Sequence, residues 1–420
     1  TARKGMVIKM KMTAKNKYAR FLVFLCSAIY FVSYLTRINY AAVMVEITKD
    51  LNITKTAASL ALTASAVSYG AGQLISGYLG DKFKPEKIIV FGLICTAAMN
   101  LLIPVMSEPG YMTAVWFVNG FAQAMMWPPI VKIMTSRLND EEYKKGCIKV
   151  FWGSSFATIF VYIASPFFIH IASWKVVFVF SAVCAVIMCF LWIFGYKTVK
   201  KHLKNNNAAA TAEESAQKEK FTPAVFALLL VFMFGVAIQG SLRDGVTNWM
   251  PSYISETFNL GSEISILTNV VLPIFSLFMY SLTRELNKRF IKNECLCMAF
   301  IYAFGTVCAL LFALFGNKNA AFAVCIAAIL AGAMHGVNYC QTCLSPVYFK
   351  RYGKVSLISG VINSGTYIGS SISTYGIAYL SKTLAWEQIA FIWCITAALG
   401  GVICLAISGM WGRFTNNASE

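Results

Sequence analysis

Long apolar runs separated by short polar breaks extend along almost the whole chain. Each run covers roughly 20 to 30 residues, the length that an α-helix needs to cross the hydrocarbon core of a membrane. The runs are far longer than the alternating segments of about ten residues in β-barrels, and a helix satisfies its own backbone polar groups in lipid. We therefore expect twelve membrane-spanning helices, at residues 21–47, 57–80, 87–107, 111–138, 146–171, 174–196, 222–255, 263–283, 294–316, 319–349, 355–381 and 386–411.

A long polar segment divides these spans into two groups of six. Residues 197–220 are rich in Lys, Asn, Ala and Glu and contain few large apolar residues, which is typical of a linker. The pattern predicts an all-α membrane protein with two pseudo-symmetric six-helix bundles. Its parts in chain order are a basic tail at 1–20, a first bundle at 21–197, a linker at 198–221, a second bundle at 222–411 and a tail at 412–420.

Composition and charge indicate how this arrangement is oriented. The chain is 58% hydrophobic and only 13% charged, whereas about a quarter of the residues in a soluble protein are charged. The net charge of +18 is not spread like a nucleic-acid footprint, because Lys and Arg gather in alternate loops. The positive-inside rule then places both termini and the linker in the cytoplasm, with the basic loops beside anionic lipid. The opposite loops hold only Lys49, Lys55, Lys175, Lys318 and Lys382.

Arg37 and Arg243 each lie in the middle of an apolar run. A guanidinium keeps its proton in proteins, and placing one at mid-membrane depth costs about 2.5–3.5 kcal/mol on the insertion scale. The two residues are separated by roughly half of the 420-residue chain. The economical hypothesis is that one arginine from each half of a duplicated protein faces a common water-filled cavity and holds an anion there.

Strongly polar side chains recur in every third span. The first, fourth, seventh and tenth spans hold most of them, so these helices are expected to be central and the third, sixth, ninth and twelfth peripheral. Four repeats of three helices are typical of transporters built from inverted repeats. Besides the two arginines, the polar residues of the central spans are Asn39, Asn119, Gln123, Lys132, Gln239, Asp244, Asn248, His335, Asn338 and Gln341.

Three motifs resemble those of one superfamily of transporters. The loop Gly77-Tyr-Leu-Gly-Asp81-Lys82-Phe83 is similar to the G-x-L-x-D-R/K loop of the major facilitator superfamily. The fourth span contains Gln123-x-x-x-Trp-Pro-Pro129, and the seventh contains Arg243-x-Gly-x-x-x-Trp-x-Pro-x-Tyr253. Together these motifs resemble the organophosphate:phosphate antiporters, which include bacterial glycerol-3-phosphate and hexose-6-phosphate transporters and eukaryotic glucose-6-phosphate relatives. The resemblance covers the whole region of the spans.

This resemblance implies a phosphate clamp formed by Arg37 and Arg243. It also implies that several tyrosines line the ligand cavity, and other polar residues of the spans complete the candidate set. The candidate substrate-binding residues besides the arginines are Tyr30, Tyr34, Tyr69, Gln73, Gln123, Asn248, His335 and Tyr367.

The chain departs from the family pattern at four positions. Gln73 stands where some members carry Lys, and Phe156 or a close neighbour stands where they carry His. Asp244 stands where a neutral residue is expected, and Asn248 replaces an acid. The missing cations would favour a phosphate dianion over a carboxylate. A carboxylate ligand is therefore the main alternative.

Four residues have roles other than, or besides, direct binding. Adjacent helical positions point about 100° apart, so Asp244 is expected not to neutralise Arg243 and is a candidate coupling residue. Lys132 either takes part in coupling and ligand contact or extends toward the cytoplasmic interface. His335 either makes an interhelical hydrogen bond or contacts the ligand or responds to protons. Asp81 fits a residue that closes the cytoplasmic gate.

The sequence predicts a secondary active transporter that exchanges a phosphate ester, such as a sugar phosphate or glycerol phosphate, for inorganic phosphate by alternating access. The alternative is a proton-coupled symporter of a carboxylate such as a sugar acid. No Walker motif and no cluster of acids and His suggests an enzyme, and we expect no metal or cofactor. The expected protein is a monomer in a bacterial inner membrane whose partners are the organic anion, inorganic phosphate and lipid, with no nucleic acid.

Overall fold

The computed structural model describes residues 2–203, 219, 221–260 and 262–416. In these ranges the chain forms helices joined by short loops and contains no β-strand. Contacts divide the chain into two compact units. Unit 1 comprises Thr1–Lys218 together with Val355–Leu357, and unit 2 comprises Glu219–Lys354 and Ile358–Glu420. The predicted linker at 198–221 lies mostly outside the described residues.

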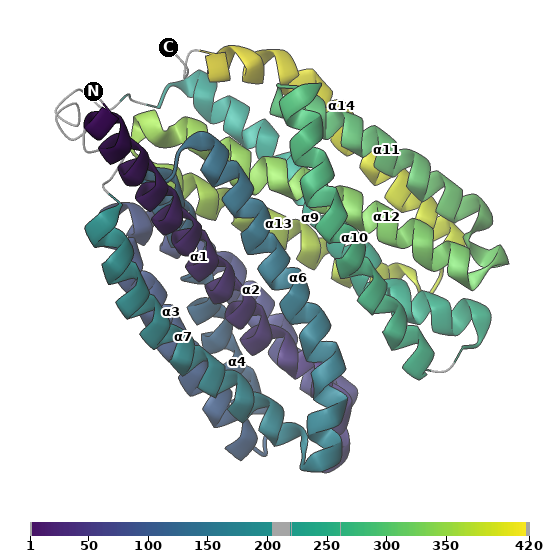
Figure 1. The fold of residues 1–420 in the computed structure, drawn as a ribbon. Coiled ribbons are helices and arrows are strands. Elements are labelled where there is room, and N and C mark those ends of the chain that lie inside the picture. The colour runs from purple at the N-terminus through teal and green to yellow at the C-terminus, as the bar shows by residue number, and fades with distance from the viewer. Residues whose placement is uncertain (1, 204–218, 220, 261, 417–420) are drawn as a thin grey trace. The chain divides into compact units, whose positions relative to one another are not determined.

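Unit 1 contains the first six predicted spans (Figure 1). Its helices are α1 (Ala2–Asp50), α2 (Lys55–Lys82), α3 (Pro85–Leu102) with the short η1 (Ile103–Val105), α4 (Pro109–Ala124), α5 (Trp127–Arg137), α6 (Asp140–Ile171) and α7 (Trp174–His202). The apolar run at 111–138 is divided at Met125 and Met126, just before two prolines that cannot donate helical hydrogen bonds. The predicted tail at 1–20 continues the first span, since α1 begins at Ala2.

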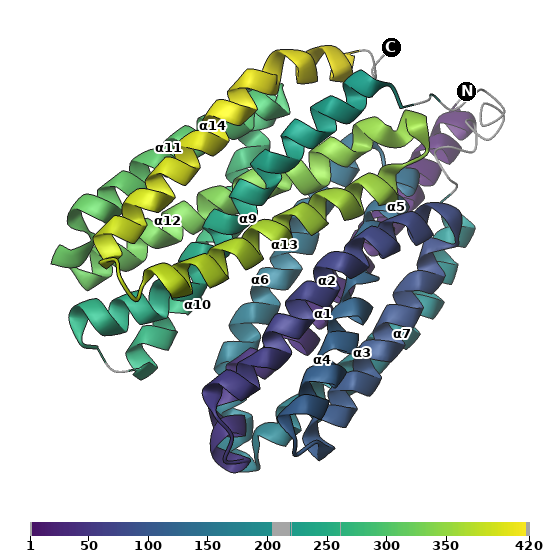
Figure 2. The same ribbon diagram turned by 180° about the vertical axis from the view of Figure 1, so that it is seen from behind.

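Unit 2 contains the remaining six spans (Figure 2). Its helices are α9 (Pro223–Phe258), α10 (Ser262–Arg289), α11 (Glu294–Phe315) with η3 (Gly316–Lys318), α12 (Ala320–Tyr339) with η4 (Cys340–Leu344) and η5 (Ser345–Tyr352), α13 (Val355–Leu380) and α14 (Trp386–Asn416). The run at 319–349 changes from α-helix to a π-helical turn, η4, and then to a 3-10 helix, η5. Each predicted span coincides with one helix or with consecutive helical segments, which confirms the all-α prediction.

Polar caps explain where several helices begin. The Thr54 hydroxyl accepts a hydrogen bond from the backbone N–H of Ala57 at 3.2 Å at the start of α2. Asn139 and Glu142 form a reciprocal capping box at the start of α6, with distances of 2.8 and 3.1 Å. The Asn319 side chain caps α12 in the same way. Each cap satisfies a backbone N–H that has no partner within its helix, so the cap defines the helix start.

Eight helical segments in the described ranges are long and apolar enough to cross a membrane, judged by length and composition. They are Asn16–Asp50, Pro85–Val105, Asp140–Ile171, Trp174–His202, Pro223–Phe258, Glu294–Lys318, Ala320–Tyr352 and Trp386–Asn416. Other helices that coincide with predicted spans, such as α2 and α13, are rich in Ser, Thr and Gly. These small polar residues lower the hydropathy of both helices.

Helices within each unit pack side by side. In unit 1, α1 contacts α6 and α7, and α2 contacts α4; in unit 2, α11 contacts α14, and α10 contacts α12. The close approach of α9 to α13 depends on glycine. A Cβ atom on Gly240 would lie 1.9 Å from the Thr366 carbonyl oxygen, and one on Gly369 would lie 1.8 Å from that of Ala237. Small residues of this kind let membrane helices approach closely.

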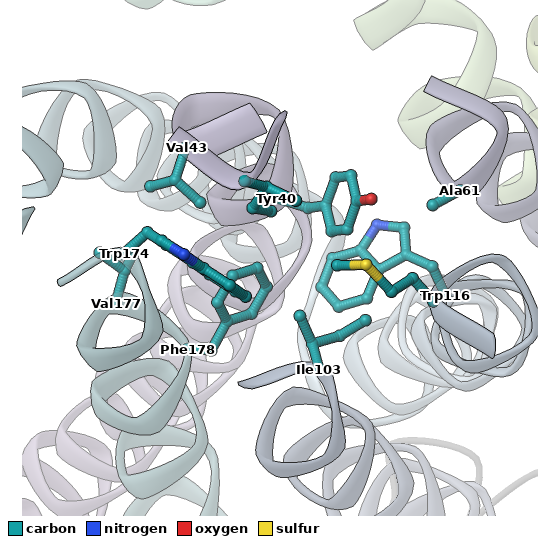
Figure 3. Close-up of a cluster of buried hydrophobic side chains, with 10 residues drawn as sticks. Tyr40, Val43, Ala61, Ile103, Trp116, Trp174, Val177 and Phe178 are labelled. Carbon is teal, nitrogen blue, oxygen red and sulfur yellow. The ribbon is translucent and has the colours of Figure 1, made fainter. Parts of the chain in front are cut away.

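A buried aromatic cluster holds the end of α1 against α4 and α7 (Figure 3). The Tyr40 ring centroid lies 5.2 Å from that of Trp116, and Trp116 lies 5.7 Å from Phe178 in an edge-on arrangement. The Tyr40 hydroxyl donates to the carbonyl oxygen of Ala58 at 3.1 Å, so its buried polar atom is satisfied. This packing anchors α1 one turn beyond Arg37.

Candidate substrate-binding site

Tyrosine rings contact Arg37 in the middle of α1. The guanidinium carbon of Arg37 lies 4.2 Å from the ring centroid of Tyr34 and 4.9 Å from that of Tyr69 on α2. Cation–π contacts of this kind stabilise a positive charge held away from bulk water. Unit 1 thus brings together three of the residues proposed from the sequence, while their contact with a ligand stays a prediction.

Tyr30 continues this aromatic group. Its ring centroid lies 5.3 Å from that of Tyr34 and 5.3 Å from that of Trp127. Trp127 in turn stacks on Phe151 of α6 at 5.0 Å. The tryptophan of the Trp-Pro-Pro motif therefore supports the tyrosines next to Arg37.

A network of buried hydrogen bonds joins α1, α3 and α4 beside Arg37. The carbonyl oxygen of Thr36 accepts from the amide of Asn100 at 3.1 Å and from the amide of Asn119 at 3.2 Å. The Asn39 amide donates to Asn100 Oδ1 at 2.7 Å. Since Thr36 precedes Arg37 in the chain, these bonds fix the register of three helices at the level of the arginine.

Gln123 belongs to the same network. Its Oε1 accepts from the Ser33 hydroxyl at 2.5 Å, and its Nε2 lies 2.7 Å from both the Thr36 and Thr96 hydroxyl oxygens. The residue is 1% exposed. With its amide oxygen and nitrogen both engaged in unit 1, Gln123 fits a positioning role better than the ligand contact expected from the sequence.

The sequence analysis missed four hydroxyl residues of the network, Ser33, Thr36, Thr96 and Ser181. Ser181 on α7 accepts from the Asn39 amide at 3.1 Å, and the Thr96 hydroxyl on α3 donates to Asn119. Ser and Thr in membrane helices commonly bond their own backbone, so their presence carries little information. The sequence did contain one indication of such partners: the amides of Asn39 and Asn119 need polar partners when they are buried.

Gln73 on α2 is fully buried, and neither atom of its amide has a hydrogen-bond partner among the described residues. An unsatisfied buried polar group costs about 1–3 kcal/mol. Gln73 therefore stays a candidate for a polar ligand contact. Phe156, at the other position where a family cation is replaced, is 51% exposed on α6.

Asp81 and Lys132 form an ion pair in unit 1. Lys132 Nζ lies 3.0 Å from Asp81 Oδ1, and the Asp81 side chain is 8% exposed. The Asp81 carboxylate also accepts from the backbone N–H groups of Ser356 at 3.1 Å and Leu357 at 2.8 Å, two residues grouped with unit 1. Lys132 is therefore the partner of the candidate gate residue, a role that the sequence analysis did not consider.

Arg243 and Asp244 on α9 pair directly, contrary to expectation. Arg243 Nε lies 2.6 Å from Asp244 Oδ1, and Nη2 lies 2.8 Å from Oδ2. The prediction that Asp244 would not neutralise Arg243 is wrong. It considered the directions of the Cβ atoms and neglected the length of the arginine side chain, which folds back over its neighbour. One edge of the Arg243 guanidinium is thus occupied by a carboxylate.

His335 on α12 contacts Tyr280 on α10. The Tyr280 hydroxyl lies 2.8 Å from His335 Nδ1, and the two rings meet edge-on. Tyr280 is 3% exposed. It was not among the predicted site residues, because a tyrosine in an apolar run gives no sign of its partner.

The other polar residues of unit 2 divide into buried and exposed groups. The Gln239 amide donates to the carbonyl oxygen of Met334 at 3.0 Å and accepts from Asn338 at 3.4 Å, inside the packing of α9 and α12. Asn248 is exposed and donates to the Thr374 hydroxyl at 3.3 Å, and Tyr367 on α13 is partly exposed. Asn248 and Tyr367 are thus the more accessible candidates.

Each unit, considered by itself, holds one of the two arginines that lie in the middle of an apolar run. Arg37 is stabilised by aromatic rings, and Arg243 is stabilised by a carboxylate. A guanidinium presents its N–H donors in a planar fork that matches phosphate or carboxylate oxygens. Across the part of the chain that the structure describes, no group of three or more His, Cys, Asp or Glu is placed to hold a metal ion. Groups of this kind are able to bind an oxyanion.

Relatives with known names are transporters of organic anions. The glycerol-3-phosphate transporter of Bacillus subtilis (strain 168) is 27% identical over 282 residues, which are 61% of this chain and 62% of that protein. The probable hexose phosphate transport protein of Chlamydia muridarum (strain MoPn / Nigg) is 22% identical over 404 residues, 88% of this chain and 87% of that protein. The probable galactarate/D-glucarate transporter of Bacillus subtilis (strain 168) is 24% identical over 202 residues, 46% of this chain and 44% of that protein.

The family assignment rests on a longer match. The family model of the Major Facilitator Superfamily matches residues 26–374, which include helices of both units. The likeness to phosphate-ester transporters that the motifs predicted is confirmed by the named relatives, although at low identity. An all-helical chain with this match over most of its length belongs to the Major Facilitator Superfamily.

Proposed function

We propose that the protein carries a phosphate ester, such as a sugar phosphate or glycerol phosphate, across a membrane in exchange for inorganic phosphate. The observation that carries the proposal is the presence in each unit of an arginine within a membrane-spanning helix, Arg37 in α1 and Arg243 in α9. The superfamily match supports transport, and the named relatives support the class of ligand.

The arginines are proposed to bind the phosphate group of the ligand. Each guanidinium can donate two parallel hydrogen bonds to phosphate oxygens, which gives both affinity and orientation. Lysine, a point charge without this fork, could not replace them. The residues proposed to complete the ligand site are Tyr30, Tyr34, Tyr69, Tyr367, Gln73, Asn248 and His335.

Exchange is the coupling mode that these charges favour. A bound anion offsets the positive charge of a guanidinium that is held within membrane helices. In transporters with inverted repeats, the two halves rock around a fixed site. If the arginines must hold an anion before the carrier can change conformation, the carrier crosses between its two conformations only with an anion bound. It therefore exchanges one anion for another. Asp81, held by Lys132, is proposed to close the cytoplasmic side.

A second candidate function is proton-coupled transport of a carboxylate such as a sugar acid. The observation that favours it is the Arg243–Asp244 pair, since protonation of Asp244 would release the guanidinium for a carboxylate ligand. The relative named as a galactarate/D-glucarate transporter supports the same class of ligand.

Uptake by proteoliposomes separates the two functions. Vesicles loaded with inorganic phosphate receive labelled glycerol-3-phosphate or hexose-6-phosphate outside, and matched vesicles contain chloride instead. For an exchanger, uptake depends on internal phosphate and survives a protonophore. Uptake that requires an inward proton gradient, ignores internal phosphate and disappears in Asp244→Asn would instead establish the symporter.

A further inference from the structure

We propose that Asp244 is an internal competitor for the substrate anion. Its carboxylate occupies the fork of Arg243, and an anionic ligand that uses the same fork must displace it. This inference rests on the proposed function and adds a specificity-determining residue to it. Asp244 is also one of the positions at which this chain departs from the family pattern.

The geometry of the pair is that of a bound ligand. Arg243 meets the two oxygens of Asp244 through Nε and Nη2, at 2.6 and 2.8 Å. This bidentate arrangement is the one in which arginine binds carboxylate and phosphate ligands. A ligand that needs the same edge of the guanidinium must therefore break both hydrogen bonds to Asp244.

The Arg243–Asp244 pair is easier to open than an ion pair that joins two helices. Arg243 and Asp244 are neighbours on α9, so their contact does not join two separate helices. By contrast, the contact between Lys132 and Asp81 joins α5 to α2. The side chains of Arg243 and Asp244 are also 13% and 21% exposed, so water can reach both when they part. Opening the pair breaks hydrogen bonds between two neighbours on one helix, while Asp244 also has a side-chain hydrogen bond with Ser370 on α13.

Competition of this kind favours ligands that bind Arg243 more strongly than a single carboxylate does. Asp244 is tethered beside Arg243, so its effective concentration at the fork is high, on the millimolar scale or above. A monocarboxylate offers the same two oxygens and charge, and it gains little by exchange. A phosphate monoester carries up to two charges and three terminal oxygens, so it can displace the carboxylate. When the ligand leaves, Asp244 refills the fork and assists release.

The first test measures binding of inorganic phosphate and glycerol-3-phosphate to the purified protein and to Asp244→Asn. An asparagine preserves the size of the side chain but cannot form a bidentate ion pair. Since hydrogen bonds to charged groups contribute about 1.5–3 kcal/mol, removing the competitor should lower the Kd of both ligands at least tenfold. An unchanged or raised Kd would show that Asp244 orients Arg243 instead, and the inference would be wrong.

A double-mutant cycle separates competition from a simple change of charge. Arg243→Lys keeps the positive charge but has no fork for Asp244 to occupy. In that background, Asp244→Asn should change the Kd by less than about threefold, because the two mutations act through one contact. An equal gain in both backgrounds would mean that Asp244 acts by its charge at a distance, which overturns the inference.

Thermal stability tests the pair without relying on transport. Asp244→Asn leaves Arg243 without its carboxylate, so the ligand-free variant should have a lower Tm than the natural protein, and inorganic phosphate should raise its Tm by more. An equal Tm and an equal phosphate-induced shift would contradict the inference. If the natural protein binds phosphate but transports no phosphate ester, the proposed function fails, while the comparison of Kd and Tm with phosphate still decides the role of Asp244.

Discussion

At the scale of single residues, the two intramembrane arginines are stabilised by different chemistry. Arg37 lies against the rings of Tyr34 and Tyr69, whereas Arg243 faces the carboxylate of Asp244. An aromatic partner does not compete for the hydrogen-bond donors of a guanidinium in the way that a carboxylate does.

Arg37→Lys should weaken binding of inorganic phosphate at least tenfold, because the variant keeps the charge but loses the planar fork and its fit against the tyrosine rings. Calorimetric titration of the purified protein measures the effect. Lys132→Gln is the matched control: it removes a positive charge outright, but that charge is paired with Asp81. If Lys132→Gln weakens binding as much as Arg37→Lys does, binding depends on overall charge and the fork hypothesis is wrong.

The sequence predicts which residues belong to the site better than it predicts their contacts, because contacts depend on side-chain length and rotamer. Arg37 and Arg243 stand out because an arginine inside an apolar run is costly in lipid and therefore rare. The pairing of Asp244 was missed because it depends on the rotamer of a long side chain, which helical periodicity does not specify. Gln123 was placed in the correct span, but its neighbours Ser33 and Thr96 became visible only when α1, α3 and α4 were packed together.

At the scale of helices, buried amides decide how the first unit is joined. Gln123 links α4 to α1 and α3 through three hydrogen bonds, whereas Gln73 on α2 is equally buried and has no partner among the described residues. Polar bonds between membrane helices contribute modestly, roughly 0.6 kcal/mol on average. An unsatisfied buried amide has the opposite effect, since its desolvation is not offset.

Replacement of these two glutamines by leucine should therefore have opposite effects on thermal stability. Gln123→Leu removes the acceptor of the Ser33 hydroxyl and the amide that donates to the Thr36 and Thr96 hydroxyls, so it should destabilise the protein by about 1–3 kcal/mol, seen as a lower Tm. Gln73→Leu removes an amide that has no partner and should leave the Tm unchanged or higher. Equal losses in the two variants, measured by thermal unfolding in detergent without ligand, would show that the network contributes nothing specific.

The helices themselves were largely predictable, but hydrophobicity alone did not predict their interruptions. Apolar runs specify spans because lipid requires the backbone to bond within each helix. The division between α4 and α5 at Met125 and the π-helical turn at Cys340 depend on local backbone geometry, which hydrophobicity alone does not describe. π-helical turns are frequent at functional sites, and this one follows the helix that carries His335.

At the scale of the whole molecule, the two units share a plan. Each contains six predicted spans, one arginine inside its first span, and buried amide contacts beside that span. Shared features of this kind are those of a duplicated transporter. The superfamily match confirms the architecture, while the direction in which the protein crosses the membrane is a prediction from charge.

Cysteine labelling tests that direction. The loop after α10 is basic and should be cytoplasmic, whereas η3 at the end of α11 should face outward. Arg289 and Asn317 are both exposed, so single cysteines at these positions should be accessible from their own side of the membrane. The background carries Cys325→Ser, because Cys325 is exposed in the natural chain.

A membrane-impermeant maleimide should then label Asn317→Cys in spheroplasts, and it should label Arg289→Cys only after the membrane is opened. The physical reason is that the basic loops resist transfer across the membrane, so the loop that contains Arg289, Lys288 and Lys292 stays in the cytoplasm. The Cys325→Ser background without a new cysteine controls for labelling of the remaining native thiols. Labelling of Arg289→Cys in sealed spheroplasts would reverse the orientation, and it would place Asp81, predicted to share the cytoplasmic side with that loop, at an outward-facing gate.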